Sequence, residues 1–167
     1  GADANARLSS TADLLNGSLT VLHVAARWGR VDIVRQLVRD GGAKIDAGCG
    51  GSDNVTALGM AVDHGRTNTA RALIDFGADV SIVSGSGWTP LATAANHGNV
   101  ELVKKLIKAG AKPSQRVGGG FTALHCLTVG LPVAEWSAGC LVALYQGGAD
   151  LDARDHNGRT LLFIAAS

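Results

Sequence analysis

The chain of 167 residues has few aromatic side chains and almost no net charge. Phe, Trp and Tyr together make up 4% of the residues, and the formal net charge is +1. So small a charge gives no electrostatic basis for binding nucleic acid or an anionic membrane surface. No apolar run approaches the roughly 18 residues of a membrane-spanning helix, and the first residues lack the basic-then-apolar pattern of a signal peptide. We therefore expect neither nucleic acid binding nor membrane insertion.

Cysteine is also scarce, and no Cys-x-x-Cys pair occurs. Cys49, Cys126 and Cys140 are an odd number without paired spacing, which is typical of a reducing compartment. Zinc sites need several ligands at tight spacing, and the histidines and cysteines of this sequence assemble no such set. We therefore expect an intracellular, cytoplasmic protein with no metal and no cofactor.

One pattern occurs four times: a Thr-x-Leu opening, an Ala-rich stretch, an apolar stretch of the kind Leu-Val-x-x-Leu, and a Gly-Ala pair. The openings begin at Thr20, Thr56, Thr89 and Thr122, with a fifth at Thr160, at intervals of 36, 33, 33 and 38 residues. The closing pairs begin at Gly42, Gly77, Gly110 and Gly148. A period of about 33 residues predicts a unit of two helices followed by a β-turn finger.

Each unit carries the signals for two short helices. The opening Thr is suited to cap the first helix, and Pro90 fits the first helical position because its missing N–H costs nothing there. Leu91, Ala94 and Ala95 fall on one narrow apolar stripe. Gly favours the left-handed conformation that ends each second helix. Because helices of about ten residues are marginal alone, stacking of neighbouring units must stabilise them.

These residues resemble the ankyrin repeat. The third unit fits the pattern best, beginning Gly87-Trp88-Thr89-Pro90-Leu91, continuing through His97-Gly98-Asn99 and ending in Gly110-Ala111. So many coincident positions at a fixed period are more specific than any single short motif. The resemblance implies an all-α ankyrin-repeat solenoid with about four helix–turn–helix repeats, partial repeats at both ends and β-hairpin fingers.

On this pattern residues 1–167 form one ankyrin-repeat domain. Its expected parts are the tail of a preceding repeat with a linker (1–19), repeat 1 (20–55), repeat 2 (56–88), repeat 3 (89–121), repeat 4 (122–159) and a partial repeat 5 (160–167). Repeat 4 has an insertion near 131–136, where we expect Pro132 to end the first helix and Trp136 to fold back on the apolar ridge.

Both ends of the sequence lack the polar capping repeat with which solenoids normally end. We therefore expect a segment of a longer array. The apolar residues between Leu161 and Ala165 would otherwise expose a contiguous patch, which soluble monomers seldom leave open. We expect this segment to bury itself against another copy or against Leu144 and Tyr145.

The resemblance also implies where a partner binds: at the finger tips and at the last residues of each inner helix, around a concave groove. In this sequence the candidate residues are Arg27, Trp28, Asp63, His64, Trp88, Asn96, His97, Arg116, Phe121, His156 and Asn157. Trp28 beside Arg27 has typical hot-spot chemistry, with packing over the next finger as an equal alternative. For Trp88 and Phe121, which precede the opening Thr, packing along the groove wall is favoured. We expect Trp28 and Trp88 to lie off the apolar stripes.

Three further groups have a functional and a structural interpretation. In the ankyrin family the His that follows Thr-x-Leu usually bonds between neighbouring fingers, and this role is favoured for His23 and His125. A thiolate near an imidazole would be a nucleophile, but Cys126 falls on a stripe expected to be buried, where thiols are inert. The lysines of 104–112 could attract an acidic partner, although a solvated face is favoured.

We therefore expect a non-catalytic scaffold, monomeric in solution, that binds a protein or peptide partner through the concave groove. An alternative from another class is a targeting or regulatory domain of a larger enzyme, signalling receptor or channel whose effector domain lies outside these residues. A third is an architectural role within a larger solenoid. An enzyme would require converging titratable groups, and the sequence shows none.

Overall fold

The computed structural model describes residues 5–8, 19–50, 54–128 and 137–166. These residues belong to two compact units, Gly1–Ser86 and Gly87–Ser167. The insertion expected near 131–136, with Pro132 and Trp136, lies outside the described residues.

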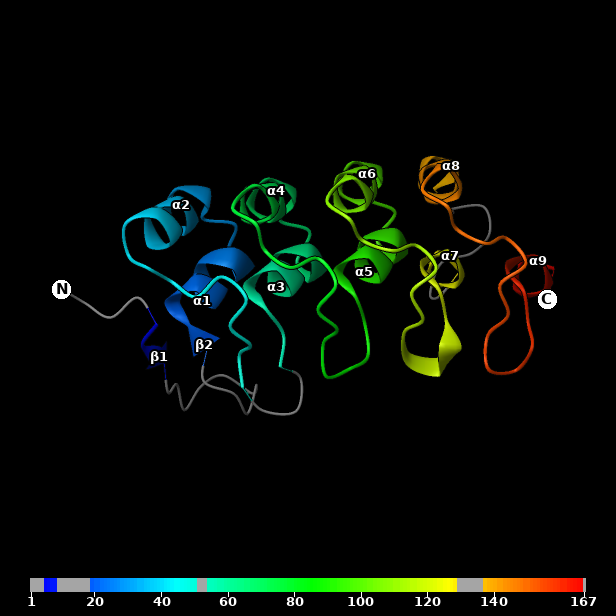
Figure 1. Ribbon diagram of the computed structural model, residues 1–167, viewed down its shortest axis with the longest axis horizontal. Coiled ribbons are helices and arrows are strands. Elements are labelled where there is room, and N and C mark those ends of the chain that lie inside the picture. Colours follow the sequence, from blue (N-terminus) through cyan, green and yellow to red (C-terminus); the bar gives the residue numbers. More distant parts are fainter. Residues whose placement is uncertain (1–4, 9–18, 51–53, 129–136, 167) are drawn as a thin grey trace. The chain divides into compact units, whose positions relative to one another are not determined.

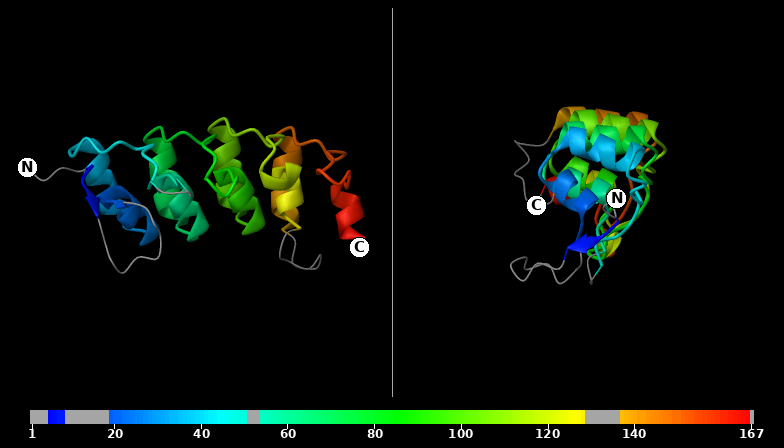
Figure 2. Two further views of the ribbon diagram at one scale, coloured as in Figure 1. Left: turned by 90° about the horizontal axis from the view of Figure 1, so that it is seen from below. Right: turned by 90° about the vertical axis from the view of Figure 1, so that its left-hand side faces the viewer.

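The first unit contains two pairs of antiparallel helices and a short β-ribbon. Its elements are β1 (Arg7–Leu8), β2 (Leu19–Thr20), α1 (Val21–Arg27), α2 (Val31–Arg39), α3 (Ala57–Asp63) and α4 (Thr67–Asp75). β1 and β2 are antiparallel, with Arg7 opposite Thr20. The inner helices α1 and α3 pack side by side, and the outer helices α2 and α4 form a second layer over them (Figures 1 and 2).

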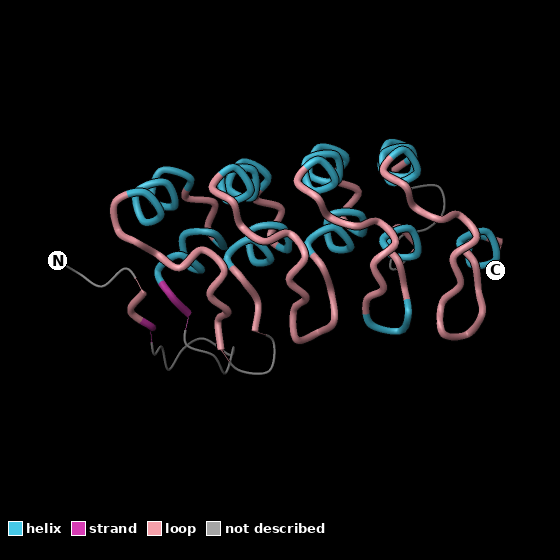
Figure 3. The backbone as a smooth tube through the Cα atoms, viewed as in Figure 1, coloured by secondary structure: helices cyan, strands magenta, loops and turns pink. Residues whose placement is uncertain are grey.

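The second unit repeats this arrangement and adds one more inner helix. Its elements are α5 (Pro90–Asn96), α6 (Val100–Lys108), the 3₁₀ turn η1 (Gly118–Gly120), α7 (Ala123–Cys126), α8 (Ala138–Gln146) and α9 (Leu161–Ala165). The inner helix α5 packs against α7, and the outer helix α6 packs against α8. Long loops leave the outer helices and return to the next inner helix as fingers (Figure 3). The all-α fold expected from the sequence is confirmed.

The opening Thr begins every inner helix, as predicted. Thr56 Oγ1 accepts the backbone N–H of Gly59 at 3.2 Å, and Thr89 Oγ1 accepts that of Ala92 at 3.1 Å. Pro90 is the first residue of α5. Gly42, Gly77, Gly110 and Gly148, which follow the outer helices, all have positive φ. Because an L side chain is strained in that conformation, glycine is required where the chain leaves the helix for the finger.

The core consists of the predicted apolar stripes. The Leu of each complete Thr-x-Leu opening is at most 2% exposed, namely Leu22, Leu58, Leu91 and Leu124. Each outer helix also buries an apolar residue completely: Val34 in α2, Leu73 in α4, Leu106 in α6 and Leu144 in α8. Inner and outer helices therefore share one apolar layer within each unit.

The C-terminal helix α9 departs from the expectation. Leu161 is buried, but Leu162 is 73% exposed and Phe163 is also exposed. Burial of this segment against Tyr145 is wrong, because Tyr145 on α8 is itself exposed. The physical reason is that α9 continues the layer of inner helices beside α7, so that it does not fold over the outer helix (Figure 1). Burial against another copy stays a prediction.

Thr69 in α4 is a buried polar residue whose hydroxyl group lacks a hydrogen-bond partner among the described residues. Its side chain is 1% exposed, and Oγ1 has no hydrogen-bond partner among the described residues. A buried hydroxyl without a partner costs about 1–3 kcal/mol, and Val has nearly the same shape without the hydroxyl. We expect Thr69→Val to raise the free energy of unfolding by about 1 kcal/mol in urea denaturation.

The matched control for this substitution is Thr93→Val in α5. The hydroxyl of Thr93 donates to the carbonyl oxygen of Thr89 at 3.2 Å, so its removal should bring no gain. A loss of stability in Thr69→Val would mean that this hydroxyl has a partner in solution.

Candidate functional site

Three candidate residues occupy the same structural position at the ends of inner helices. Trp28 and His64 are the C-caps of α1 and α3 in the first unit, and His97 is the C-cap of α5 in the second. Trp28 is 61% exposed, His97 is exposed and His64 is half-buried. The fold thus places an indole in repeat 1 and an imidazole in repeats 2 and 3 at one repeated position.

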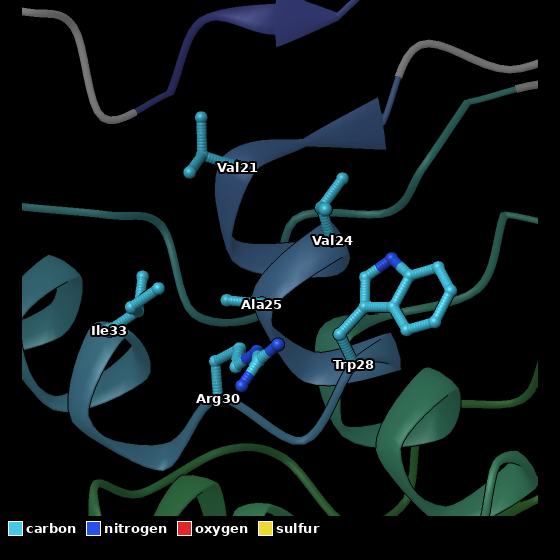
Figure 4. A pocket seen from close by; sticks show the side chains of 6 residues that line it. All are labelled: Val21, Val24, Ala25, Trp28, Arg30 and Ile33. Carbon is cyan, nitrogen blue, oxygen red and sulfur yellow. The ribbon is translucent and has the colours of Figure 1, made fainter.

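Trp28 also borders a pocket in the first unit. The pocket has a volume of about 360 Å³ and is lined by Val21, Val24, Ala25, Trp28, Arg30 and Ile33, from α1 and the start of α2 (Figure 4). An indole that packs flat over a neighbouring finger would be mostly covered. The exposure of Trp28 therefore favours an accessible aromatic over the packing alternative.

Asp63 and His64 lie together at the end of α3. His64 Nδ1 is 3.6 Å from Asp63 Oδ2 and donates to the carbonyl oxygen of Met60 at 3.0 Å. The Asp63 carboxylate is well exposed and the imidazole is about one-third exposed. In the described part of the chain, no three His, Cys, Asp or Glu side chains converge as a metal site requires.

Trp88 and Phe121 are half-buried and have a packing role in the second unit. Both pack against a buried cluster of Ala92, Val117 and Cys126. The Phe121 ring also lies 5.9 Å from the His125 ring, centroid to centroid. Trp88 thus lies outside the helices that carry the apolar stripes, but its indole covers part of a buried cluster. The packing interpretation favoured for both aromatics is confirmed.

The remaining candidates of the second unit divide into anchored and exposed side chains. Asn96 Nδ2 donates to the carbonyl oxygen of Cys126 at 3.1 Å. Arg116 Nη1 donates to the carbonyl oxygens of Gly120 at 2.9 Å and Arg154 at 2.6 Å, and so joins two fingers. His156 and Asn157 are exposed at the tip of the later finger. Asn96 and Arg116 thus hold neighbouring backbone segments together. The side chains of His156 and Asn157, in contrast, are exposed to solvent at the finger tip.

An ion pair between a partly exposed Arg and a buried carboxylate lies in the finger that carries His156 and Asn157. Arg159 lies 2.8 Å from the buried carboxylate of Asp155, which also accepts the backbone N–H groups of Arg159 and Asn157. Burial by itself raises the pKa of Asp155, but these hydrogen bonds and the guanidinium charge outweigh it and lower the pKa below the usual 3.8. The charged carboxylate therefore stabilises the finger.

This lowered pKa gives a pH prediction. A depressed folded-state pKa contributes stability that is complete above the usual pKa and is lost as the pH falls through the folded value. We expect the difference in free energy of unfolding between wild type and Asp155→Asn to shrink as the pH falls from about 5 to about 2. Asp152→Asn, an exposed neighbour on the same loop, is the control. An unchanged difference across this range would show that the pair does not persist in solution.

His23 and His125 have the structural role that was favoured for them. In each case Nδ1 accepts the backbone N–H of the opening Thr, and Nε2 donates to a carbonyl oxygen of the next finger, Val55 at 3.0 Å and Arg159 at 3.2 Å. Both histidines are buried. Because both ring nitrogens of His125 are engaged, it cannot serve as a base for Cys126.

Cys126 has the properties of an inert thiol. Its side chain is fully buried, and burial raises its pKa to about 12. The thiol therefore stays protonated at neutral pH, where only a thiolate would be a nucleophile. The interpretation of His125 and Cys126 as a catalytic pair is not supported by this geometry.

The repeated helix pairs match a known family. The family model of ankyrin repeats (3 copies) matches residues 2–84 and 22–117. The chain belongs to the ankyrin-repeat family. The comparison with curated proteins gives no match. Within the described residues, no helix of this ankyrin-repeat chain has the length and apolar character needed to cross a membrane.

One contact between ankyrin repeats was missed in the sequence. Arg66, directly after Gly65, donates from Nε to the carbonyl oxygen of Arg27 at 3.0 Å and so joins α4 of repeat 2 to the end of α1. The signal that could have identified it is the Gly-Arg pair, which occurs at the same place in repeat 1 as Gly29-Arg30. Arg30 lines the pocket beside Trp28.

Proposed function

We propose that this ankyrin-repeat chain binds a protein or peptide partner through the ends of its inner helices and the tips of its fingers. Ankyrin repeats are generally protein–protein interaction modules and are typically non-catalytic. The observation that carries the proposal is the set of C-cap residues Trp28, His64 and His97. This position holds an indole in repeat 1 and an imidazole in repeats 2 and 3, and the three rings are partly or largely exposed, while the Leu of each of these openings is buried.

In the first unit the proposed contact centres on Trp28. Exposed indoles are enriched among the residues that dominate binding energy, because they bury a large apolar area and lose few rotamers on binding. Arg27 and Arg30 place two cationic groups near it, and Asp63 and His64 lie at the end of the next inner helix. This surface suits a segment that offers an apolar side chain together with an acidic one.

In the second unit the proposed contacts are His97 at the end of α5 and the finger tip with His156 and Asn157. Their side chains are exposed, so they do not have to leave the core to reach a partner. Asn96 and Arg116 are proposed as supporting residues, because their hydrogen bonds hold the neighbouring backbone. Trp88 and Phe121 would contribute only the exposed part of each ring.

The experiment that tests the proposal compares two aromatic residues of nearly equal exposure. Trp28 is 61% exposed on an inner helix, and Tyr145 is 60% exposed on the outer helix α8. A partner isolated with the intact chain would be produced separately and titrated into wild type, Trp28→Ala and Tyr145→Ala by calorimetry. We expect Trp28→Ala to weaken binding about tenfold or more, which corresponds to about 1.4 kcal/mol, and Tyr145→Ala to leave Kd unchanged.

Circular dichroism should show the same helical content for both variants, because neither side chain belongs to the core. Equal losses in the two variants, or no loss in Trp28→Ala, would mean that binding does not use the inner-helix ends.

A further inference from the structure

Arg116 and Arg154 occupy equivalent places in the two successive fingers of the second unit, which follow α6 and α8 (Figure 3). Each donates from Nη1 to the carbonyl oxygen four residues later in its own finger, Gly120 at 2.9 Å and Gly158 at 2.9 Å. Both arginines are exposed. The backbone therefore holds one end of each guanidinium group in place at the surface. We call Arg116 and Arg154 the arginine pair.

The two fingers that carry the arginine pair are joined directly to each other. Arg116 Nη1 also donates to the carbonyl oxygen of Arg154 at 2.6 Å, and the backbone N–H of His156 donates to the carbonyl oxygen of Gly119 at 3.2 Å. The His156 ring lies against Gly120, at the place where any other residue would have its Cβ. Because these contacts fix the fingers in advance, a ligand of both arginines would lose little entropy in ordering them.

No carboxylate of these fingers is paired with the arginine pair in the described part of the chain. Asp155 is the partner of Arg159, at 2.8 Å. Asp150 and Asp152 precede Arg154 on the loop and are exposed, and neither forms an ion pair among the described residues. Nε and Nη2 of both arginines likewise have no hydrogen-bond partner there. An anion would therefore gain unused donors and relieve the repulsion between two like charges.

Arg116 shows that this position stays accessible when another finger packs beside it. The finger of residues 148–160 contacts the finger of Arg116 through the hydrogen bonds just described, and Arg116 is nevertheless exposed. Every residue of both fingers, 110–122 and 148–160, lies in the described part of the chain. The exposure of the arginine pair is therefore a property of its place at the finger.

We propose that the arginine pair binds an acidic stretch of the polypeptide partner through the carboxylates of that stretch. This inference rests on the proposed function, in which the finger tips are one of the contacts. A guanidinium group presents paired N–H donors whose geometry matches a carboxylate. Because the two arginines belong to successive fingers, one ligand must offer negative charges at intervals along its length. A run of Asp or Glu does so, whereas a single phosphate group concentrates its charge at one point.

An NMR titration of the intact chain with hexaglutamate tests this proposal, because arginine Nε–H signals report on the guanidinium groups themselves. At low salt we expect the signals of Arg116 and Arg154 to shift along a saturable curve, with Kd on the order of 1 mM. Hexaglutamine has the same length without the charges and should cause no shift. Raising the salt from about 20 mM to about 200 mM should weaken binding several-fold, because exposed charges are screened.

The matched variants are Arg154→Gln and Arg35→Gln. Each removes one exposed guanidinium group, but Arg35 lies on the outer helix α2 of the first unit. We expect Arg154→Gln to raise the Kd of hexaglutamate about fivefold and Arg35→Gln to leave it unchanged. Circular dichroism would show whether both variants are folded. If Arg154→Gln is not, Arg154→Lys replaces it with an expected loss of about twofold, because Lys keeps the charge without the planar donors.

The absence of a saturable shift with hexaglutamate, or equal losses in Arg154→Gln and Arg35→Gln, would overturn the proposal. Tighter binding of a phosphoserine peptide or an oligothymidylate of the same net charge would also overturn it, because the preferred anion would then be a phosphate. Trp28 is unchanged in every sample. A failed titration therefore leaves the calorimetric test with Trp28→Ala standing, and a failed calorimetric test leaves the titration standing.

Discussion

Replacing Leu124 by Ala is expected to lower the free energy of unfolding by about 3 kcal/mol. Leu124 is 1% exposed in α7, which packs against α5 in the second unit. Removing its isobutyl group forfeits the transfer free energy of the buried atoms and leaves a cavity, because neighbouring helices relax only in part. Urea denaturation followed by circular dichroism measures the change.

The chain offers a matched control in Leu162→Ala. Leu162 has the same place in the Thr-x-Leu opening of α9, but it is 73% exposed, and its truncation should cost less than about 0.5 kcal/mol. Similar losses in the two variants would show that α9 packs differently in solution.

The substitution His125→Leu is expected to cost about 3 kcal/mol, although Leu is the more hydrophobic residue. The imidazole joins the start of α7 to the next finger: Nδ1 accepts the N–H of Thr122 at 3.2 Å, and Nε2 donates to the carbonyl oxygen of Arg159 at 3.2 Å. Leu would leave both backbone groups without this partner, and a buried unpaired polar group costs about 1–3 kcal/mol. The added apolar burial offsets only part of this loss.

His156→Leu is the control for this prediction, because His156 is an exposed histidine in the finger that His125 anchors. Its replacement should change the free energy of unfolding by no more than about 0.5 kcal/mol. Amide hydrogen exchange adds a local measure, since the Thr122 N–H should lose protection in His125→Leu alone. Full protection of Thr122 in that variant would mean that another group caps α7.

Much of this fold followed from the sequence because its causes are local. A Thr at the start of a helix and a Gly at its end act on backbone groups within three or four residues. Thr56, Thr89 and Gly110 therefore took the predicted places. The buried Leu positions also followed, because an amphipathic stripe repeated at a constant period leaves one way to stack the helices.

The sequence predicted which positions the candidate residues occupy, but it did not predict whether each side chain is exposed or packed. Trp28 and Trp88 were both expected off the apolar stripes, yet Trp28 is exposed while Trp88 covers a buried cluster. The difference depends on Val117 in the following finger, a contact across nearly thirty residues that the pattern around Trp88 does not encode. Arg66 likewise gained its partner at Arg27 only through the stacking of two repeats.

The sequence by itself determined the helix pairs, their caps, the family and the stripe that each helix buries. Only the tertiary structure decided which members of a repeated motif are covered. Leu124 and Leu162 stand in the same motif, and their exposures differ because burial depends on the helix that packs next, which lies outside the motif. The physical reason is that capping and helical periodicity act over a few residues, whereas burial is set by neighbours brought together from distant parts of the chain.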